Sequence, residues 1–169
     1  MHEEIGQQLQ PEVLSRSLDL ALIGIAGRTE PGLDVTVFVN EPIAAIIPEG
    51  HRLDRHSLQL SDLRMEKVLC LPRGTGTREA YERSCAQADL VPQLDIDAGS
   101  PNTLLRLTTR GTGVAVLSPS SAADDGPRVV PVKDAATHAC LGLAAHPGRH
   151  SPAVRLFRAR LRTAPQGNR

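Results

Sequence analysis

The stretch KVLCLPRGTGTREAYERSCAQADLVPQLDIDAGSPNTLLRLTTRGTGVAVLS, residues 67–118, decides the predicted fold. Apolar or alternating runs at 67–72, 93–99 and 114–119 are typical of strands, and helical periodicity fills the two gaps between them, at 77–90 and 100–111. Strands that alternate with helices of about a dozen residues indicate right-handed βαβ units and a parallel sheet. We therefore predict an α/β fold.

The segments before this stretch predict further strands and helices. Residues 7–17 have helical spacing, and 18–25 form a short apolar run that we expect to be a buried strand of a parallel sheet. Residues 33–50 are β-branched and interrupted by an Asn-Glu-Pro sequence, which predicts two extended segments joined by a bend. A short helical segment is expected at 57–63.

After residue 118 the pattern predicts an extended piece at 128–132, a strand at 138–146 and a final helix at 151–163. The final helix is basic but also carries an apolar stripe. The stripe consists of Val154, Phe157 and Leu161. We expect it to pack on the core, with the arginines in solvent rather than on DNA.

The predicted order opens on a helix with no strand before it. Parallel sheets are usually built from several strands and covered on both faces. We therefore expect the first part of the fold to be incomplete, as if its opening strand and helix were missing.

Composition excludes several classes of protein. The 169 residues carry 19 basic and 19 acidic side chains, whereas nucleic-acid-binding domains usually show clustered positive charge. Two Phe and one Tyr leave little for base stacking. No apolar run approaches the ~18 residues of a membrane span, and the polar start MHEEIGQQLQ is unlike a signal peptide. We expect a cytoplasmic protein without a membrane segment.

The three cysteines leave two interpretations open. Cys70 lies in an apolar run and Cys85 in a helical pattern, so buried, inert thiols are the expected state. The alternative is a redox sensor that uses Cys70, Cys85 or Cys140, which depends on their positions in three dimensions. The sequence contains no C-x-x-C motif.

The strongest local signal is LPRGTGTREAYE, residues 71–82, where a predicted strand enters a glycine loop that opens a helix. Backbone N–H groups at such a helix start can hold an anion. Gly74 and Gly76 allow close approach, and Thr75 and Thr77 can cap the helix or donate to a ligand. The spacing fits neither a P-loop nor a dinucleotide fingerprint. A plain strand-to-helix turn with a threonine cap is the alternative.

A second junction of this kind is DAGSPNTLLRL, residues 97–107, with Gly99, Ser100, Asn102 and Thr103 between strand and helix. Neighbouring junctions lie side by side at the carboxyl ends of parallel strands, where open α/β sheets bind ligands. Together the two loops predict a site for a small polar or carboxylate-bearing molecule.

Enzyme and metal signatures are missing from the sequence. There is no G-x-S-x-G motif and no helical histidine pair beside a glutamate. His146 and His150 are separated by a Pro-Gly sequence that breaks any helix. Asp95 and Asp97 share one face of a predicted strand and are expected to be surface groups or to orient the following loop, rather than to form an acid/base pair. We predict no enzymatic activity, no metal and no cofactor.

Four blocks in order carry a resemblance to a known family. They are LDLALIG (18–24), EPIAAIIPEGH (41–51), LPRGTG (71–76) and GSPNTLLRLTTRGTGVAVLSP (99–119). From about residue 7 to 163 the chain resembles the effector-binding domain of LysR-type transcriptional regulators. Periplasmic solute-binding proteins share these blocks more loosely.

The resemblance implies two Rossmann-like lobes of the periplasmic-binding-protein type, with an effector in the cleft between them. Lobe I would comprise 1–46 plus 141–169, and lobe II 47–140, with two crossover strands near Ile47–Gly50 and near Cys140. The expected effector-binding residues are Gly24, Ile25, Arg73, Gly74, Thr75, Gly76, Thr77, Ser100, Pro101, Asn102 and Thr103.

The chain departs from the family pattern at its start. The winged helix-turn-helix domain and the first strand–helix–strand of lobe I are absent, so we expect an N-terminally truncated chain that reaches DNA only through the absent domain. The family implies a homodimer or tetramer, formed here through the helix near 77–90 or that near 8–16. A free-standing solute-binding module of the same architecture and the thiol redox sensor are the alternative functions.

Overall fold

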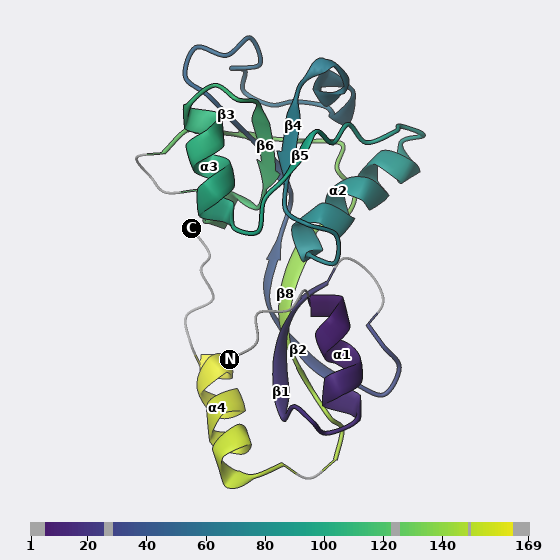
Figure 1. Ribbon diagram of the computed structural model, residues 1–169. Coiled ribbons are helices and arrows are strands. Elements are labelled where there is room, and N and C mark those ends of the chain that lie inside the picture. Colours follow the sequence, from purple (N-terminus) through teal and green to yellow (C-terminus); the bar gives the residue numbers. More distant parts are fainter. Residues whose placement is uncertain (1–5, 26–28, 123–125, 149, 164–169) are drawn as a thin grey trace.

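Two β-sheets organise the structure, a computed structural model. The described residues are 6–25, 29–122, 126–148 and 150–163. One sheet has three strands in the order β1-β8-β2, and the other has five in the order β5-β4-β6-β3-β7. Figure 1 shows the two sheets in separate lobes, linked by the extended chain of β2–β3 and β8.

The smaller sheet is antiparallel throughout. Its central strand β8 (Ala139–Ala145) pairs with β1 (Leu20–Ile25) on one side and with β2 (Asp34–Glu41) on the other. Helix α1 (Gly6–Leu14) covers one face. The buried cluster under α1 consists of Leu9, Val13, Ala21, Ile23 and Ala144.

The prediction of a parallel strand at 18–25 is therefore wrong. The partner of β1 is β8, which returns from the other lobe and runs in the opposite direction. Ala21 and Ile23 are buried whereas Leu22, between them, is 52% exposed, which is the alternation of a strand with one covered face. Within the described residues, β1 forms an edge of the sheet.

The larger sheet contains the predicted βαβ units. Strand β4 (Val68–Cys70) pairs in parallel with both β5 (Ile96–Asp97) and β6 (Val114–Leu117), as the sequence indicated. Helix α2 (Gly76–Gln87) follows β4, and α3 (Pro101–Thr109) follows β5.

The two helices cover opposite faces of this sheet. Tyr81 and Cys85 of α2 pack in the same cluster as Val68 and Cys70. Leu104 of α3 packs in another cluster with Leu69, whose side chain points to the other side. The sheet is covered on both faces, which explains the continuous apolar character of its strands.

Two antiparallel strands complete the larger sheet. Strand β3 (Ala44–Ile47) pairs with β6 and with β7 (Arg128–Pro131). Short 3-10 helices lie at Leu60–Met65 (η1) and at Pro119–Ser121 (η2). The predicted bend at Asn-Glu-Pro is confirmed, because Pro42 separates β2 from β3.

The chain first crosses from the smaller lobe to the larger one a few residues before the expected boundary at residue 46. Ala44–Ile47 forms all its ladder pairs within the larger sheet, although 1–46 was expected to belong to lobe I. The chain changes sheets at Pro42, between the end of β2 and the start of β3. We propose that lobe II begins at Ile43 and ends at His138, immediately before β8.

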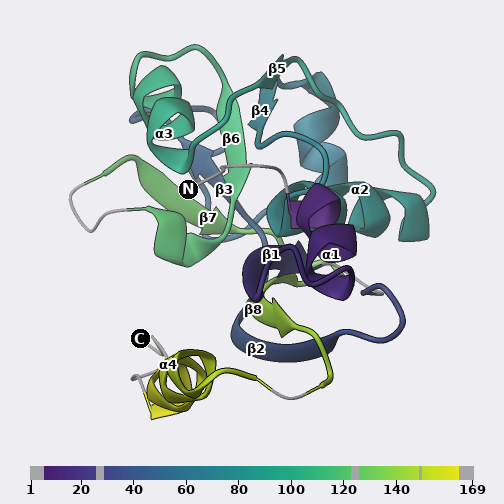
Figure 2. The same cartoon turned by 60° about the horizontal axis from the view of Figure 1, so that its bottom comes forward.

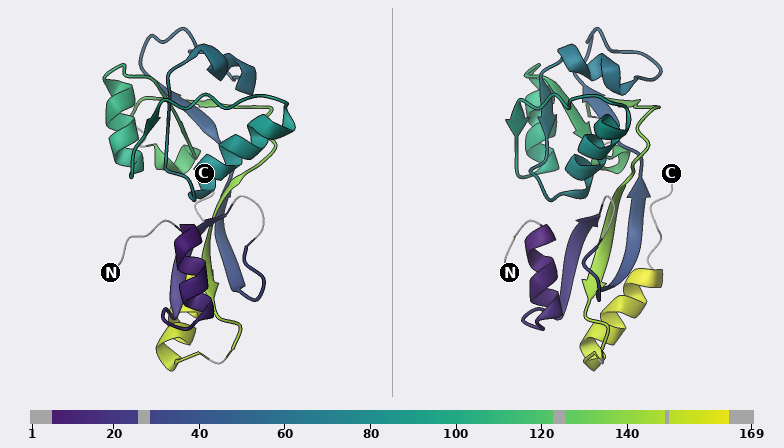
Figure 3. Two further views of the ribbon diagram at one scale, coloured as in Figure 1. Left: turned by 45° about the vertical axis from the view of Figure 1, so that its right-hand side comes forward. Right: turned by 90° about the vertical axis from the view of Figure 1, so that its right-hand side faces the viewer.

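Helix α4 (Pro152–Thr163) packs less closely than predicted. Val154 is 6% exposed, but Phe157 is 52% exposed and Leu156 is 60% exposed. Arg158 is bound to the Asp34 carboxylate of β2, which ties the helix to the smaller sheet. Figure 3 shows α1 and α4 flanking this sheet, and Figure 2 shows α4 set apart from the larger lobe.

Candidate functional site

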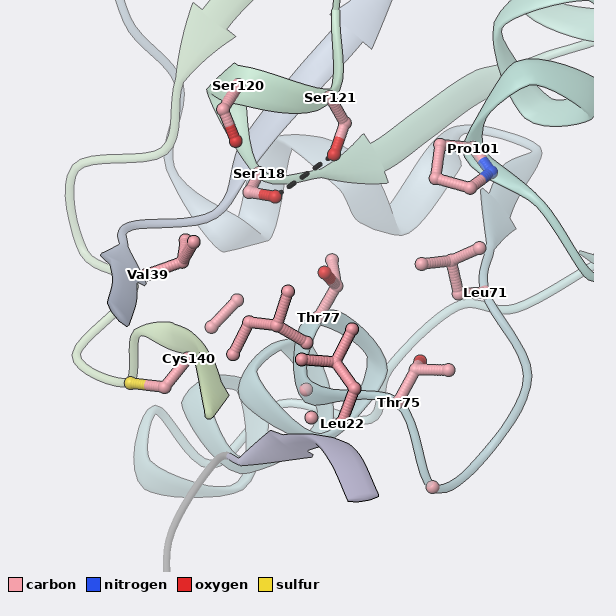
Figure 4. Close-up of a pocket in the computed structure, with 15 residues that line it drawn as sticks. Leu22, Val39, Leu71, Thr75, Thr77, Pro101, Ser118, Ser120, Ser121 and Cys140 are labelled. Carbon is pink, nitrogen blue, oxygen red and sulfur yellow. Dashed lines mark hydrogen bonds between the residues drawn. The ribbon is translucent and has the colours of Figure 1, made fainter. Parts of the chain in front are cut away.

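A cavity of about 360 Å³ lies between the two lobes, at the carboxyl ends of the parallel strands (Figure 4). The smaller sheet contributes strand residues to its wall, and the larger lobe contributes loops and helix starts. The residues that line it are Leu22, Gly24, Val39, Leu71, Gly74, Thr75, Gly76, Thr77, Pro101, Ser118, Ser120, Ser121, Ala139, Cys140 and Leu141.

The loop after β4 forms one side of this pocket. Gly74 has a φ of +88°, a conformation that favours glycine, and this turn brings the chain round to the start of α2. Thr75 is the N-cap residue, but its hydroxyl donates to the carbonyl of Pro72 at 2.8 Å and does not cap the helix. The first backbone N–H groups of α2 therefore receive no side-chain cap from Thr75.

The Thr77 side chain is the most enclosed polar group of the pocket. It is 8% exposed, and no hydrogen bond to its hydroxyl is found within the described residues. Figure 4 shows its oxygen directed into the cavity. The hydroxyl oxygen is therefore open to the cavity and free to hydrogen-bond to a ligand bound there.

Two glycines let the lobes touch beside the pocket. A Cβ on Gly24 of β1 would lie 2.2 Å from the backbone nitrogen of Gly76. A Cβ on Gly76 would lie 2.7 Å from the carbonyl oxygen of Cys140 in β8. The start of α2 thus rests directly on the backbone of the smaller sheet.

A serine-rich turn after β6 forms another part of the wall, which the sequence analysis missed. Ser118 and Ser121 share a hydrogen bond of 3.1 Å between their hydroxyl oxygens. The backbone N–H of Ser120 donates to Oε2 of Glu41 at 3.1 Å. The signal was present, since β6 is followed by S-P-S-S, but the predicted strand extended to residue 119, whereas β6 ends at Leu117.

The smaller sheet supplies an apolar wall of the pocket. Of the residues in this wall, the sequence predicted only Gly24. Leu22, Val39 and Leu141 line the pocket from three adjacent strands. Ile25 was expected beside Gly24, but it packs against the cluster under α1. The reason is the alternation of side chains along β1, which turns neighbouring residues to opposite faces.

The second predicted loop contributes less than expected. Only Pro101 of this loop lines the pocket. The Ser100 hydroxyl caps α3, because it accepts a hydrogen bond from the Thr103 backbone N–H at 3.3 Å. It also lies 3.1 Å from the Thr103 hydroxyl. Asn102 is exposed.

The expected site residues thus fall into two groups. The structure brings Gly24, Gly74, Thr75, Gly76, Thr77 and Pro101 together around the pocket. It places Ile25, Arg73, Ser100, Asn102 and Thr103 outside the pocket lining.

No charged side chain is among the described residues that line the pocket. The Arg73 side chain is 82% exposed and lies 3.6 Å from the Glu82 carboxylate. Arg78 is buried behind the loop, where its guanidinium donates to Glu82 at 2.7 Å and to Asp97 at 2.6 Å. Burial alone would lower the pKa of Arg78, but these two hydrogen bonds raise it, so the group stays charged and internally paired.

All three thiols are free, and two are shielded. Cys70 is buried, and burial raises its pKa to about 12. Burial also raises the pKa of Cys85. The pKa of Cys140 is raised for the same reason, although this thiol is only half-buried. A raised pKa removes the reactive thiolate at neutral pH.

Within the described ranges, no group of three or more His, Cys, Asp or Glu side chains is arranged to hold a metal ion. In the same residues, no helix is both long and apolar enough to cross a membrane.

A family model described as the LysR substrate binding domain matches residues 1–166. The chain belongs to this family. The pocket between the lobes therefore lies in a LysR substrate-binding domain, and the resemblance drawn from the sequence blocks is confirmed.

Curated relatives of this LysR domain are transcription regulators. The transcriptional dual regulator GltC of Bacillus subtilis (strain 168) is 29% identical over 117 residues, which cover 69% of this chain and 39% of GltC. The DNA-binding transcriptional dual regulator OxyR of Escherichia coli (strain K12) is 26% identical over 171 residues, which cover 95% of this chain and 56% of OxyR. The chain spans less than two thirds of either relative.

Solved structures confirm the two-lobed fold. The effector-binding domain of QuiR, in complex with shikimate, matches with a TM-score of 0.80 at 17% identity. The match covers 97% of this LysR domain and 80% of the QuiR chain. The expected periplasmic-binding-protein type of architecture is thus present here.

Proposed function

We propose that this LysR domain binds a small-molecule effector in the pocket between its lobes. The observation that carries the proposal is Thr77, a residue only 8% exposed whose hydroxyl has no partner in the described structure and faces the cavity beside the uncapped start of α2. Backbone N–H groups and a hydroxyl at a helix start suit a carboxylate or another polar oxygen of a ligand. QuiR, named in complex with shikimate, supports the same use of this fold.

Binding in this position would couple the two lobes. The ligand would contact Leu22, Val39 and Leu141 from the smaller sheet, and the hydroxyls of the βα loops from the larger one. Because the lobes are linked by few crossing segments, a ligand that contacts both favours one relative arrangement of the lobes over others. In a longer regulator, that preference would be passed to DNA binding and transcription.

The other parts of the proposal concern the whole protein. GltC and OxyR are longer than this chain, so we assign DNA contact to a part of the protein outside it. We also propose that the protein forms a homodimer or tetramer through α2 or α1, and that it is cytoplasmic. Both proposals agree with relatives that regulate transcription. We assign no enzymatic activity to the domain.

The thiol redox alternative has weaker support. Some curated relatives are named hydrogen peroxide-inducible genes activators, at up to 30% identity. Here, however, Cys70 and Cys85 lie in the buried core and the pKa of each is raised, which disfavours attack on peroxide.

The substitution Thr77→Val tests the proposed site. We expect it to lower the affinity for a pocket ligand about tenfold, because it removes one hydrogen bond and keeps the shape of the side chain. Affinity would be measured by isothermal titration calorimetry with benzoate, shikimate and 2-phosphoglycolate, each titrated into the 169-residue chain.

Thr109→Val is the matched control, because Thr109 is exposed on α3 and its hydroxyl donates only to the carbonyl of Leu105, at 2.9 Å. It should leave every affinity unchanged. If no compound in the panel binds in a way that depends on Thr77, the pocket is not the effector site.

A further inference from the structure

We propose that the effector is a small monocarboxylate with an apolar body, rather than a dicarboxylate, a phosphate ester or a polyhydroxylated acid. This inference rests on the proposed function, since it names the class of ligand for the same pocket.

One end of the pocket, at the start of α2, can attract negative charge, but only weakly, because no cationic side chain is among the described lining residues. The start of α2 offers backbone N–H groups and the equivalent of about half a positive charge. The two arginines nearest in sequence do not line the pocket: Arg73 lies largely in solvent, and Arg78 is paired with two carboxylates. This end can hold one carboxylate, with Thr77 as a further donor, but does not balance the charge of a phosphate ester.

The serine turn at the other end offers no positive charge. The backbone N–H of Ser120 is already bonded to the Glu41 carboxylate, which does not itself line the pocket. Ser118 and Ser121 are already bonded to each other. A second anionic group at this end would find no compensating cation among the described lining residues, which disfavours dicarboxylates.

The middle of the pocket is apolar. Leu22 and Val39 of the smaller sheet and Leu71 of the larger lobe face the cavity (Figure 4). Leu141 of β8 also lines it. Leu22 is 52% exposed, although large aliphatic side chains usually gain from burial. A ring or branched chain would cover this surface, whereas the hydroxyls of a polyhydroxylated acid would lie there without partners.

The test compares ligands that differ in one property. Benzoate and cyclohexanecarboxylate represent the proposed class. Phthalate adds a second carboxylate to benzoate, 4-phosphonobenzoate adds a phosphonate dianion to the same ring, and benzamide removes the charge. Shikimate adds three hydroxyls to a six-membered ring acid, and 2-phosphoglycolate represents phosphate esters without an apolar body. Titration calorimetry on the 169-residue chain should give at least tenfold tighter binding for the first pair than for each of the others.

A substitution in the apolar wall supplies a second measurement. Leu22→Asn should weaken the binding of cyclohexanecarboxylate at least tenfold, because it places a polar group against the body of the ligand. Val37→Asn is the matched control, since Val37 is 44% exposed on β2 and does not line the pocket. Thermal unfolding of both variants shows that the fold is retained.

The outcomes separate this inference from the proposed function. Tightest binding by a monocarboxylate, lost in both Thr77→Val and Leu22→Asn, supports both proposals. Tightest binding by phthalate, 4-phosphonobenzoate, 2-phosphoglycolate or shikimate that still depends on Thr77 overturns the ligand class and leaves the proposed function standing. Binding that is indifferent to Thr77 overturns both.

Discussion

At the scale of the residue, hydrogen bonding separates groups that are free to meet a ligand from groups with a structural role. The hydroxyls of Thr75, Thr77 and Ser100 look equivalent in the sequence, each near the start of a predicted helix. In the structure, Thr75 is bonded to Pro72 and Ser100 caps α3, whereas Thr77 has no partner within the described residues. Its place in the pocket wall then gives Thr77 its importance, because its hydroxyl faces the cavity and remains available to a ligand.

The thiols provide a prediction at the same scale. At pH 8 we expect a thiol-exchange reagent such as dithionitrobenzoate to react first with Cys140, which is only half-buried. Cys70 and Cys85 should react only after unfolding, because burial shields them and keeps them protonated. Rapid reaction of Cys70 or Cys85 in the folded chain, or a disulfide after brief peroxide treatment, would revive the redox alternative.

At the scale of the element, Arg78 fixes α2 in the place where its first turn meets the pocket. Its guanidinium bonds to Glu82 within α2, to Asp97 of β5 and, at 3.4 Å, to the carbonyl of Leu71 in the pocket wall. A buried charge with several partners holds these elements in register, and removing it takes away the hydrogen bonds that join α2 to β5 and to the loop after β4.

We therefore predict that Arg78→Met destabilises the chain by about 2 kcal/mol, because hydrogen bonds to charged groups are lost from a buried position. Arg73→Met is the control: its side chain is 82% exposed, so its pair with Glu82 should contribute about 0.5 kcal/mol or less. Urea unfolding measures both values. Equal effects of the two substitutions would show that Arg78 does not hold these elements together.

At the scale of the whole molecule, contact between the lobes depends on the absence of two side chains. Gly24 lies in β1 and Gly76 begins α2, and the backbones meet where a Cβ would not fit. The pocket is formed beside this contact, so its shape depends on how closely the lobes approach.

Gly24→Ala should accordingly lower the free energy of unfolding by roughly 2 kcal/mol, the usual scale for overpacking, although alanine is the better residue for a strand. Gly99→Ala is the control, since no atom lies within 4 Å of its added Cβ. Thermal unfolding measures stability, and small-angle scattering should show a larger radius of gyration for Gly24→Ala. An unchanged radius together with unchanged stability would contradict the close contact.

The sequence by itself determined the alternating elements of the larger lobe and the loop at Gly74–Thr77, because strand and helix periodicity, glycine turns and helix caps are local properties. It also identified the cap at Ser100, but could not show that this cap leaves Ser100 outside the pocket.

Only the tertiary structure decided which strands pair and which side chains face the pocket. The pairing of β1 with β8 joins residues more than 100 positions apart, and the apolar wall of Leu22, Val39 and Leu141 exists only once that sheet has formed. Local periodicity says which side chains share a face, but not which strand lies alongside or which lobe lies opposite. The pocket was therefore half visible in the sequence, because one wall is made of loops with a local signature and the other of ordinary strand residues brought together by long-range pairing.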